Sequence, residues 1–165
     1  MPSRGRPAVS GAPARAHVAI LATRWNADVV EKLLAGAAAT LERAGATHET
    51  FRVPGSFELP QVARRVARTR RFDAIVPLGC VIRGDTPHFQ YIARAASDGL
   101  LRVSLDEAVP IVFGVLTCDT VAQALDRAGG AEGNKGAEAA AAALELVALA
   151  QSIETRSAKA SRRTR

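Results

Sequence analysis

Residues 73–88 read DAIVPLGCVIRGDTPH, an apolar run followed by a polar loop and a histidine. Residues 73–78 are short, apolar and bounded by turn residues, which is typical of a buried strand. After the loop, Thr86 and Pro87 have the pattern of an N-cap and a first helical residue. The stretch therefore predicts a strand, a loop and a helix, with His88 in the first turn of the helix.

Three other apolar runs have the character of residues 73–78, namely residues 17–22, 47–53 and 110–116. A pattern of helical spacing follows each of the four runs, and strands that alternate with helices form parallel sheets. Polar residues stand at the expected cap positions of these helices: Asn26, Thr86, Thr120 with Gln123 three residues later, and Asn134. The sequence predicts an α/β fold, a three-layer α/β/α sandwich around a four-stranded parallel sheet.

Four chemically unusual segments directly follow the predicted strands: residues 23–26, 54–58, 79–88 and 114–120. In open parallel sheets, ligands bind outside the carboxyl ends of the strands. All four segments should therefore share one edge of the sheet and form a ligand site there. The helix that begins near His88 offers this edge free backbone N–H groups and a partial positive charge, which suit a phosphate.

The basic charge of the chain is concentrated at its two ends. Of the formal net charge of +6, residues 1–15 contribute +3, residues 151–165 contribute +4, and residues 16–150 contribute −1. The sequence predicts one near-neutral domain over residues 16–150, whose last helix ends at residue 150, between two basic tails that are disordered or loosely attached. Such tails usually keep a protein soluble; weak attachment to RNA or another polyanion is the alternative.

Cys80 and Cys118 are the two cysteines of the chain, and neither has a histidine or cysteine at metal-ligand spacing. We expect packed thiols in a reducing cytoplasm and no bound metal. No apolar run approaches the ~20 residues of a membrane span, and the apolar region of a secretion signal is missing. These features predict a cytoplasmic protein without a membrane partner.

Each candidate residue near the predicted edge has a structural explanation beside a functional one. Trp25, the single tryptophan, could stack on a flat heterocycle or cover the top of the core. Glu58 could accept hydrogen bonds from hydroxyl groups or compensate a helix dipole. His88 lies in a first helical turn that favours the neutral imidazole, and it could exchange protons or be merely solvated.

The candidate residues further along the chain also have structural explanations. Arg127 could compensate a helix C-terminus, and Phe113 could pack in the core. Lys135 and Glu138 could form a surface ion pair. Arg83 has no role that the sequence explains.

Four motifs together resemble the lumazine synthase family of riboflavin biosynthesis: Arg24-Trp25-Asn26, residues 53–60 (VPGSFELP), residues 79–88, and residues 133–136 (GNKG). The resemblance covers residues 17–150, with the motifs in the family's order and at similar separations. It implies a flavodoxin-like fold, to which an N-terminal strand can be added in the oligomer. It also implies condensation of 5-amino-6-(D-ribitylamino)uracil with 3,4-dihydroxy-2-butanone 4-phosphate, giving 6,7-dimethyl-8-ribityllumazine, phosphate and water without a cofactor.

The resemblance also implies roles for single residues. His88 is the expected acid–base group, and Arg127 is the expected phosphate ligand, which in the family often comes from the neighbouring subunit. The implied substrate-binding residues are Trp25 on the pyrimidine ring, where the family usually has phenylalanine, Ser56, Phe57 and Glu58 on the ribityl chain, and Cys80, Val81, Ile82, Asp85, Thr86, Phe113 and Lys135 elsewhere in the pocket. Asp85 fits beside a phosphate only if its carboxylate turns away.

The family's pocket lies between adjacent subunits, so the resemblance implies a homo-oligomer that binds small-molecule substrates. A pentamer is the expected minimal unit, and some members of the family assemble further into decamers or icosahedral shells.

Three other functions stay open. The same fold could carry a flavin or lumazine without catalysis. It could be a nucleotide-binding or signalling domain, although the loop after the first strand lacks a glycine-rich phosphate motif. The tails could also make it a polyanion-binding protein.

Overall fold

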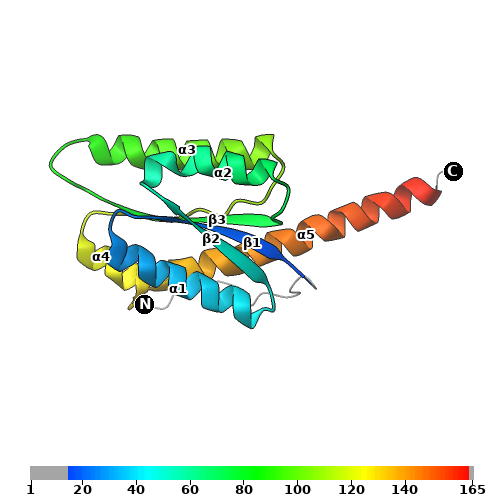
Figure 1. Ribbon diagram of the computed structural model, residues 1–165, viewed down its shortest axis with the longest axis horizontal. Helices are drawn as coiled ribbons and strands as arrows, with labels where there is room; N and C mark the ends of the chain where they lie inside the picture. Colours follow the sequence, from blue (N-terminus) through cyan, green and yellow to red (C-terminus); the bar gives the residue numbers. More distant parts are fainter. Residues whose placement is uncertain (1–14, 164–165) are drawn as a thin grey trace.

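A four-stranded parallel sheet in the order β2–β1–β3–β4 forms the centre of the computed structural model, which describes residues 15–163 and the side chains up to residue 158 (Figure 1). The strands are β1 (His17–Thr23), β2 (Thr47–Val53), β3 (Ala74–Ile82) and β4 (Gly114–Cys118). β1 pairs with β2 along its whole length and with β3 over residues 18–22. The predicted four-stranded parallel sheet is confirmed.

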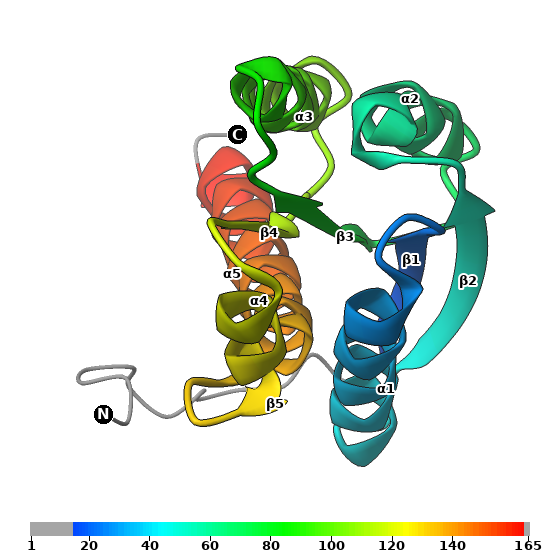
Figure 2. The same ribbon diagram turned by 90° about the vertical axis from the view of Figure 1, so that its left-hand side faces the viewer.

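Helices cover both faces of the sheet (Figure 2). One face carries α1 (Ala27–Arg43), α4 (Val121–Arg127) and α5 (Lys135–Arg163), and the other carries α2 (Leu59–Arg68) and α3 (His88–Asp106). Successive side chains of a strand point to opposite faces. Ile20 and Val76 therefore enter the core under α1 and α5, whereas Leu21 and Ile75 enter the core under α2 and α3. The three-layer, flavodoxin-like architecture is confirmed.

The largest differences from the predicted strand boundaries are in β3 and β4. β3 continues beyond Leu78 to Ile82, because these residues pair with β4. β4 begins at Gly114 rather than at residue 110, and before it Ile111 forms an isolated bridge to Ile75. Gly114 allows the close approach of the two strands, since a Cβ there would lie 2.6 Å from Cδ2 of Leu78.

Two of the four predicted helix caps are wrong. Asn26 precedes α1 in a left-handed conformation, with φ of 56°, and its Nδ2 donates to the carbonyl oxygen of Cys80 at 2.8 Å instead of its own helix. α3 begins at His88, so that Pro87 rather than Thr86 occupies the N-cap position. Asn26 therefore ties the loop after β1 to the end of β3.

The other two caps are confirmed. Oγ1 of Thr120 accepts from the backbone N of Gln123 at 3.2 Å, and Oε1 of Gln123 accepts in return from the backbone N of Asp119 at 2.9 Å. The reciprocal bond reaches one residue further back than the capping box predicts. At the start of α5, Oδ1 of Asn134 accepts from the backbone N of Ala137 at 3.0 Å.

α1 and α5 pack closely because glycines lie between them. A Cβ on Gly136 would lie 2.1 Å from the carbonyl oxygen of Leu33, far inside van der Waals contact. On the other helix, a Cβ on Gly36 would lie 2.4 Å from the side chain of Asn134. The first turn of α5, which carries Lys135, therefore rests directly on α1.

A 3-10 helix (Ser56–Glu58) precedes α2, and a small antiparallel ladder, β5 (Ala128–Gly130) and β6 (Gly133–Asn134), joins α4 to α5.

α5 runs to Arg163 instead of ending at residue 150. Figure 1 shows its C-terminal part projecting beyond the sheet, and the side chains of residues 151–158 are exposed. The segment that the sequence treats as a loose tail is thus helical up to residue 163, because alanine and arginine are good helix formers. The N-terminal tail, with any strand it adds to a neighbouring sheet, falls almost entirely within residues 1–14, outside the described residues.

Within the described residues, α5 is the one helix that is long and apolar enough to cross a membrane by length and composition, over Lys135–Ala158. This finding differs from the prediction that no apolar run approaches the length of a membrane span. Ala140, Ala143 and Leu144 of this helix are buried in the core that it shares with α1 and the sheet. The N-terminal part of α5 is thus a core helix, and one such helix is by itself weak evidence for a membrane span.

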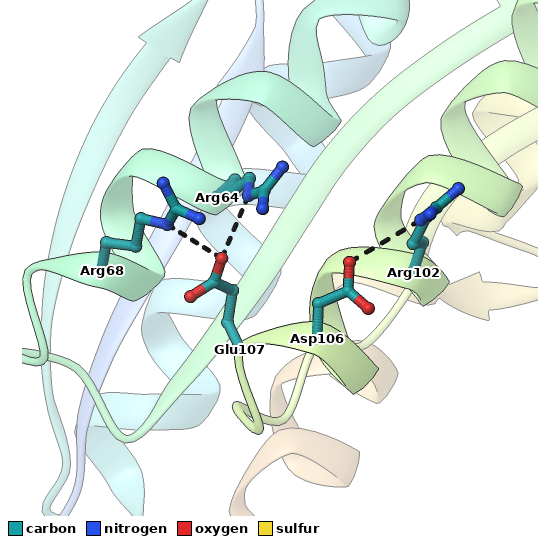
Figure 3. A network of polar contacts seen from close by, with 5 residues as sticks. All are labelled: Arg64, Arg68, Arg102, Asp106 and Glu107. Carbon is teal, nitrogen blue, oxygen red and sulfur yellow. Dashed lines mark hydrogen bonds and ion pairs between the residues drawn. The ribbon is translucent and has the colours of Figure 1, made fainter.

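Glu107 joins α2 to the end of α3 (Figure 3). Its Oε1 accepts hydrogen bonds from Nε of Arg68 at 2.9 Å and Nε of Arg64 at 3.0 Å. These bonds, first that of Arg68 and then that of Arg64, hold the pKa of the Glu107 carboxyl below its usual value. Beside this network, Arg102 and Asp106 form a looser pair at 3.7 Å within α3.

We predict that Glu107→Gln lowers the melting temperature near neutral pH but not at acid pH. A carboxyl whose pKa is depressed on folding stabilises the protein above its unfolded pKa of about 4.3 and loses this contribution as the pH falls through the folded pKa. Thermal unfolding of both proteins across this pH range checks the prediction, with Asp106→Asn as the control for a pair within one helix. A difference in melting temperature between Glu107→Gln and the wild type that is independent of pH would contradict the prediction.

Candidate active site

The carboxyl ends of β1, β2 and β3 open into a cavity of about 650 Å³, which we name the His88 hollow. Three of the four predicted segments meet in it. Its lining residues are Trp25, Asn26, Gly55, Ser56, Phe57, Glu58, Cys80, Val81, Ile82, His88 and Ile92.

A second cavity of about 530 Å³, the Arg127 hollow, opens beside β4. Phe113, Arg127, Lys135 and Glu138 line it together with residues 114–117 of β4. The fourth predicted segment therefore lies mainly in a different cavity of the same chain. Within one chain, the residues that the resemblance assigns to the pocket are divided between the two hollows, apart from Asp85 and Thr86, which line neither.

Trp25 lies at the rim of the His88 hollow and is 74% exposed, which excludes the alternative that it covers the core. A Cβ on Gly55 would lie 3.2 Å from Cδ1 of Trp25 and 3.0 Å from Oε2 of Glu58. The indole and the carboxylate therefore approach the same point of the loop after β2. An exposed ring beside a carboxylate can stack on a heterocycle while hydroxyl groups of the same ligand donate to the acid.

Ser56 and Phe57 begin the short helix before α2 and differ sharply in exposure. Ser56 is buried, and its Oγ would lie 2.8 Å from a Cβ on Gly79, so glycine at that position leaves room for the hydroxyl. Phe57 is 57% exposed at the rim. Thr23 meets the same point of β3, and its buried Oγ1 has no hydrogen-bond partner among the described residues. The sequence assigned no role to this threonine, because a polar residue at a strand end is common.

β3 supplies Cys80, Val81 and Ile82 to the His88 hollow. Burial, and then the nearby Cys118, raise the pKa of the Cys80 thiol to about 12. The thiol is therefore un-ionised near neutral pH and is no nucleophile, as expected of a packed cysteine. The carbonyl oxygen of Cys80 accepts the Asn26 hydrogen bond at 2.8 Å, across 54 residues of sequence. Only the folded chain reveals this contact.

His88 is the first residue of α3 and lies exposed at the rim of the His88 hollow. The preceding loop, residues 83–87, is exposed and contains Asp85 and Thr86. No described side chain caps α3, so the first amides of the helix stay open to an anion. The imidazole thus stands between the His88 hollow and backbone amides that no described side chain caps.

The Arg127 hollow combines an aromatic ring with two cations. Phe113 is 42% exposed instead of packed in the core. Nζ of Lys135 lies 3.0 Å from both carboxylate oxygens of Glu138, which is the ion pair that the sequence left as an alternative. Arg127 ends α4 and donates from Nη1 to the carbonyl oxygen of Gln123 at 3.0 Å. This set suits an aromatic, anionic ligand.

Asn134 organises the surroundings of the Arg127 hollow, although the sequence identified it only as a cap. Its Nδ2 donates to the carbonyl oxygens of Lys32 at 2.8 Å and Ala128 at 3.3 Å. Asn134 thereby connects α1, the residue after α4 and the start of α5, between Arg127 and Lys135. Within the described part of the chain, no group of three or more His, Cys, Asp or Glu side chains could hold a metal ion.

A protein-family model described as 6,7-dimethyl-8-ribityllumazine synthase matches residues 15–151. The match covers most of the chain and includes every residue that lines either hollow. It also includes all four motifs that carry the resemblance. The chain therefore belongs to the 6,7-dimethyl-8-ribityllumazine synthase family, and its activity is the transferase step of riboflavin biosynthesis that this family catalyses.

Proposed function

We propose that the chain condenses 5-amino-6-(D-ribitylamino)uracil with 3,4-dihydroxy-2-butanone 4-phosphate in the His88 hollow. The observation that carries this assignment is the meeting of Trp25, Glu58 and His88, from three different loops, around one cavity. A stacking surface, a hydroxyl acceptor and an acid–base group are what the two substrates require.

The substrates have distinct places in this proposal. The pyrimidine ring stacks on Trp25 beside Cys80, Val81 and Ile82, and the ribityl chain extends toward Ser56, Phe57 and Glu58. The phosphate takes the backbone amides around Asp85 and Thr86, with the exposed Asp85 carboxylate turned to solvent.

The reaction proceeds by proton transfers and the loss of stable leaving groups. The pyrimidine amine attacks the ketone carbon, and loss of water gives an imine. Removal of a proton from the neighbouring carbon expels phosphate as the C–O bond breaks and leaves an enol. The terminal carbon of the enol takes up a proton and its hydroxyl group loses one, which gives a carbonyl and a methyl group. The second amine then closes the ring on the resulting carbonyl, and a second water leaves. His88 moves the protons, the amides before α3 stabilise the departing phosphate, and alignment of the two substrates contributes several kcal/mol.

We propose that an adjacent subunit completes the site. Phe113, Arg127 and Lys135 line the Arg127 hollow rather than the His88 hollow of the same chain. If the Arg127 hollow of one subunit faces the His88 hollow of the next, Phe113 covers the heterocycle and Arg127 reaches the phosphate. The family is generally oligomeric, which supports this arrangement.

α3 offers a surface that supports assembly into a ring. Tyr91, Arg94, Asp98, Leu101 and Leu105 recur at the spacing of coiled-coil core positions, and all five are exposed. Packing this face against neighbouring copies would remove two exposed leucines from water. We take five as the number of copies from the general assembly of the family, with decamers and shells as further steps, and we place the protein in the cytoplasm.

The first experiment mixes the purified protein with both substrates and follows the fluorescence of the lumazine product. We expect a rate above that of the spontaneous reaction in an enzyme-free control. Light scattering on the same sample should give five times the chain mass of 17.3 kDa, or a multiple of that value. An assembled protein without a rate enhancement would favour a flavin or lumazine carrier, which a riboflavin titration would then test.

A further inference from the structure

Arg83 is the residue of the 79–88 motif that the sequence leaves unexplained, and the structure gives it three contacts. Its backbone N donates to the carbonyl oxygen of Cys118 at 2.9 Å. Its Nε donates to Oδ1 of Asp119 at 2.5 Å. Its guanidinium carbon lies 4.8 Å from the centre of the Phe89 ring. Arg83 thus contacts the end of β4 and the first turn of α3 at once.

These contacts lie on both sides of residues 84–87, the loop that leads to His88. Cys118 is the last residue of β4 and Asp119 follows it in the connection to α4, whereas Phe89 follows His88 in α3. All of residues 84–87 are exposed, and a Cβ on Gly84 would meet nothing within 4 Å among the described residues. One side chain therefore connects both ends of a loop that has little packing of its own.

The backbone of Asp119, whose carboxylate Arg83 contacts, is itself held in place. The backbone N of Asp119 donates to Oε1 of Gln123 at 2.9 Å, and the next residue, Thr120, caps α4. A guanidinium can donate to a carboxylate at its edge while its face lies over a ring, which an ammonium cannot do. The pair is half exposed, so its effect on global stability is small and its main effect is on the loop.

We propose that Arg83 is a positioning residue, which holds residues 84–87 in the conformation that receives the substrate phosphate. This inference rests on the proposed function, in which the phosphate lies against these amides. Amides that are fixed before binding lose no freedom when the phosphate arrives, so the affinity for the phosphate-bearing substrate depends on the order of the loop. Asp119 neutralises the guanidinium, and Arg83 therefore acts through geometry rather than by attracting the phosphate itself.

Steady-state kinetics with each substrate varied in turn test the proposal. In Arg83→Met, we expect the KM for 3,4-dihydroxy-2-butanone 4-phosphate to rise about tenfold, and the KM for the pyrimidine to change less than about twofold. Arg83→Lys keeps the charge but not the planar group and should resemble Arg83→Met. Asp119→Asn should have an intermediate effect, and the double variant should be no worse than Arg83→Met alone, because the two residues act as one unit.

Arg71 provides a matched control just before the opposite end of β3. Its Nη2 donates to Oε2 of Glu49 at 2.9 Å, and its guanidinium carbon lies 5.2 Å from the centre of the Phe72 ring. The Arg71 side chain is 60% exposed and that of Arg83 is 50% exposed, so the two arginines are alike in surroundings. Arg71→Met should lower the melting temperature about as much as Arg83→Met and leave both KM values unchanged.

Hydrogen–deuterium exchange measures the loop without any substrate. The amides of residues 84–86 should exchange about tenfold faster in Arg83→Met than in the wild type, and at the wild-type rate in Arg71→Met. Unchanged exchange in Arg83→Met would overturn the proposal, as would an equal rise in both KM values. A wild-type oligomer without turnover would overturn the proposed function and the phosphate role with it, whereas faster exchange in Arg83→Met would still support the loop contact.

Discussion

Replacement of His88 by alanine slows the condensation by about 100-fold or more and leaves binding of the lumazine product nearly unchanged. The imidazole lies at the rim of the His88 hollow, where it can reach the reacting atoms without forming the stacking surface. Its loss removes the proton carrier for imine formation and for phosphate elimination, while Trp25 and Glu58 still hold the ring and the ribityl chain. Single-turnover fluorescence measures the rate, and a titration with the product measures binding.

Gln90→Ala is the matched control for this experiment. Gln90 is exposed in the same first turn of α3, but it does not line the His88 hollow. The Gln90→Ala variant should catalyse the condensation at the wild-type rate. If His88→Ala turned over at the wild-type rate as well, His88 would have no part in the chemistry, and alignment of the substrates would have to account for the whole rate enhancement.

Gly136→Ala lowers the free energy of unfolding by about 3 kcal/mol. The new Cβ would lie 2.1 Å from the carbonyl oxygen of Leu33 and 2.9 Å from its Cα, and backbone atoms cannot move aside as the end of a flexible side chain can. α1 and α5 must therefore separate, which loosens the core between them. Urea unfolding at a fixed protein concentration measures the change as a lower midpoint with an unaltered slope.

Gly84→Ala tests whether the loss of stability in Gly136→Ala comes from the clash of the new Cβ or from the replacement of a glycine as such. A Cβ on Gly84 meets nothing within 4 Å among the described residues, so the free energy of unfolding of Gly84→Ala should stay within about 0.5 kcal/mol of the wild-type value. Equal stability of Gly136→Ala and the wild type would mean that the two helices can move apart at no cost. The close contact would then not anchor the first turn of α5.

Sequence patterns predicted the fold well wherever the signal is local. The apolar runs of β1 and β2 match the observed strands closely, because both ends of each run are marked by turn residues. The caps Thr120 and Asn134 were also predicted, since each bonds to a backbone N–H three residues away. Asn26 has the same residue type as Asn134, but its amide bonds to β3 rather than to its own helix. Residue type alone does not distinguish these two situations.

The site was predicted less completely, for reasons that lie in the assembly of the elements. The rule for parallel sheets brought the loops after β1, β2 and β3 together, and these loops do line one cavity. Phe113 and Arg127, which the family resemblance places in the pocket from a neighbouring subunit, line the Arg127 hollow beside β4. How the two hollows relate depends on contacts between copies, which no periodicity within one chain encodes. The contacts of Arg83 depend likewise on a carboxylate 36 residues away.

The length of α5 has a practical consequence for anyone who wishes to label or immobilise the protein. α5 borders the Arg127 hollow from Lys135 to Glu145, and the helix beyond Glu145 rises about 1.5 Å per residue, so its last residue lies roughly 25 Å beyond that hollow. The helix also leaves the body of the molecule on the side opposite the carboxyl ends of the strands (Figure 1). A fluorophore, affinity tag or cargo domain fused after Arg163 would therefore stand clear of both substrate cavities, on a spacer that the protein already provides.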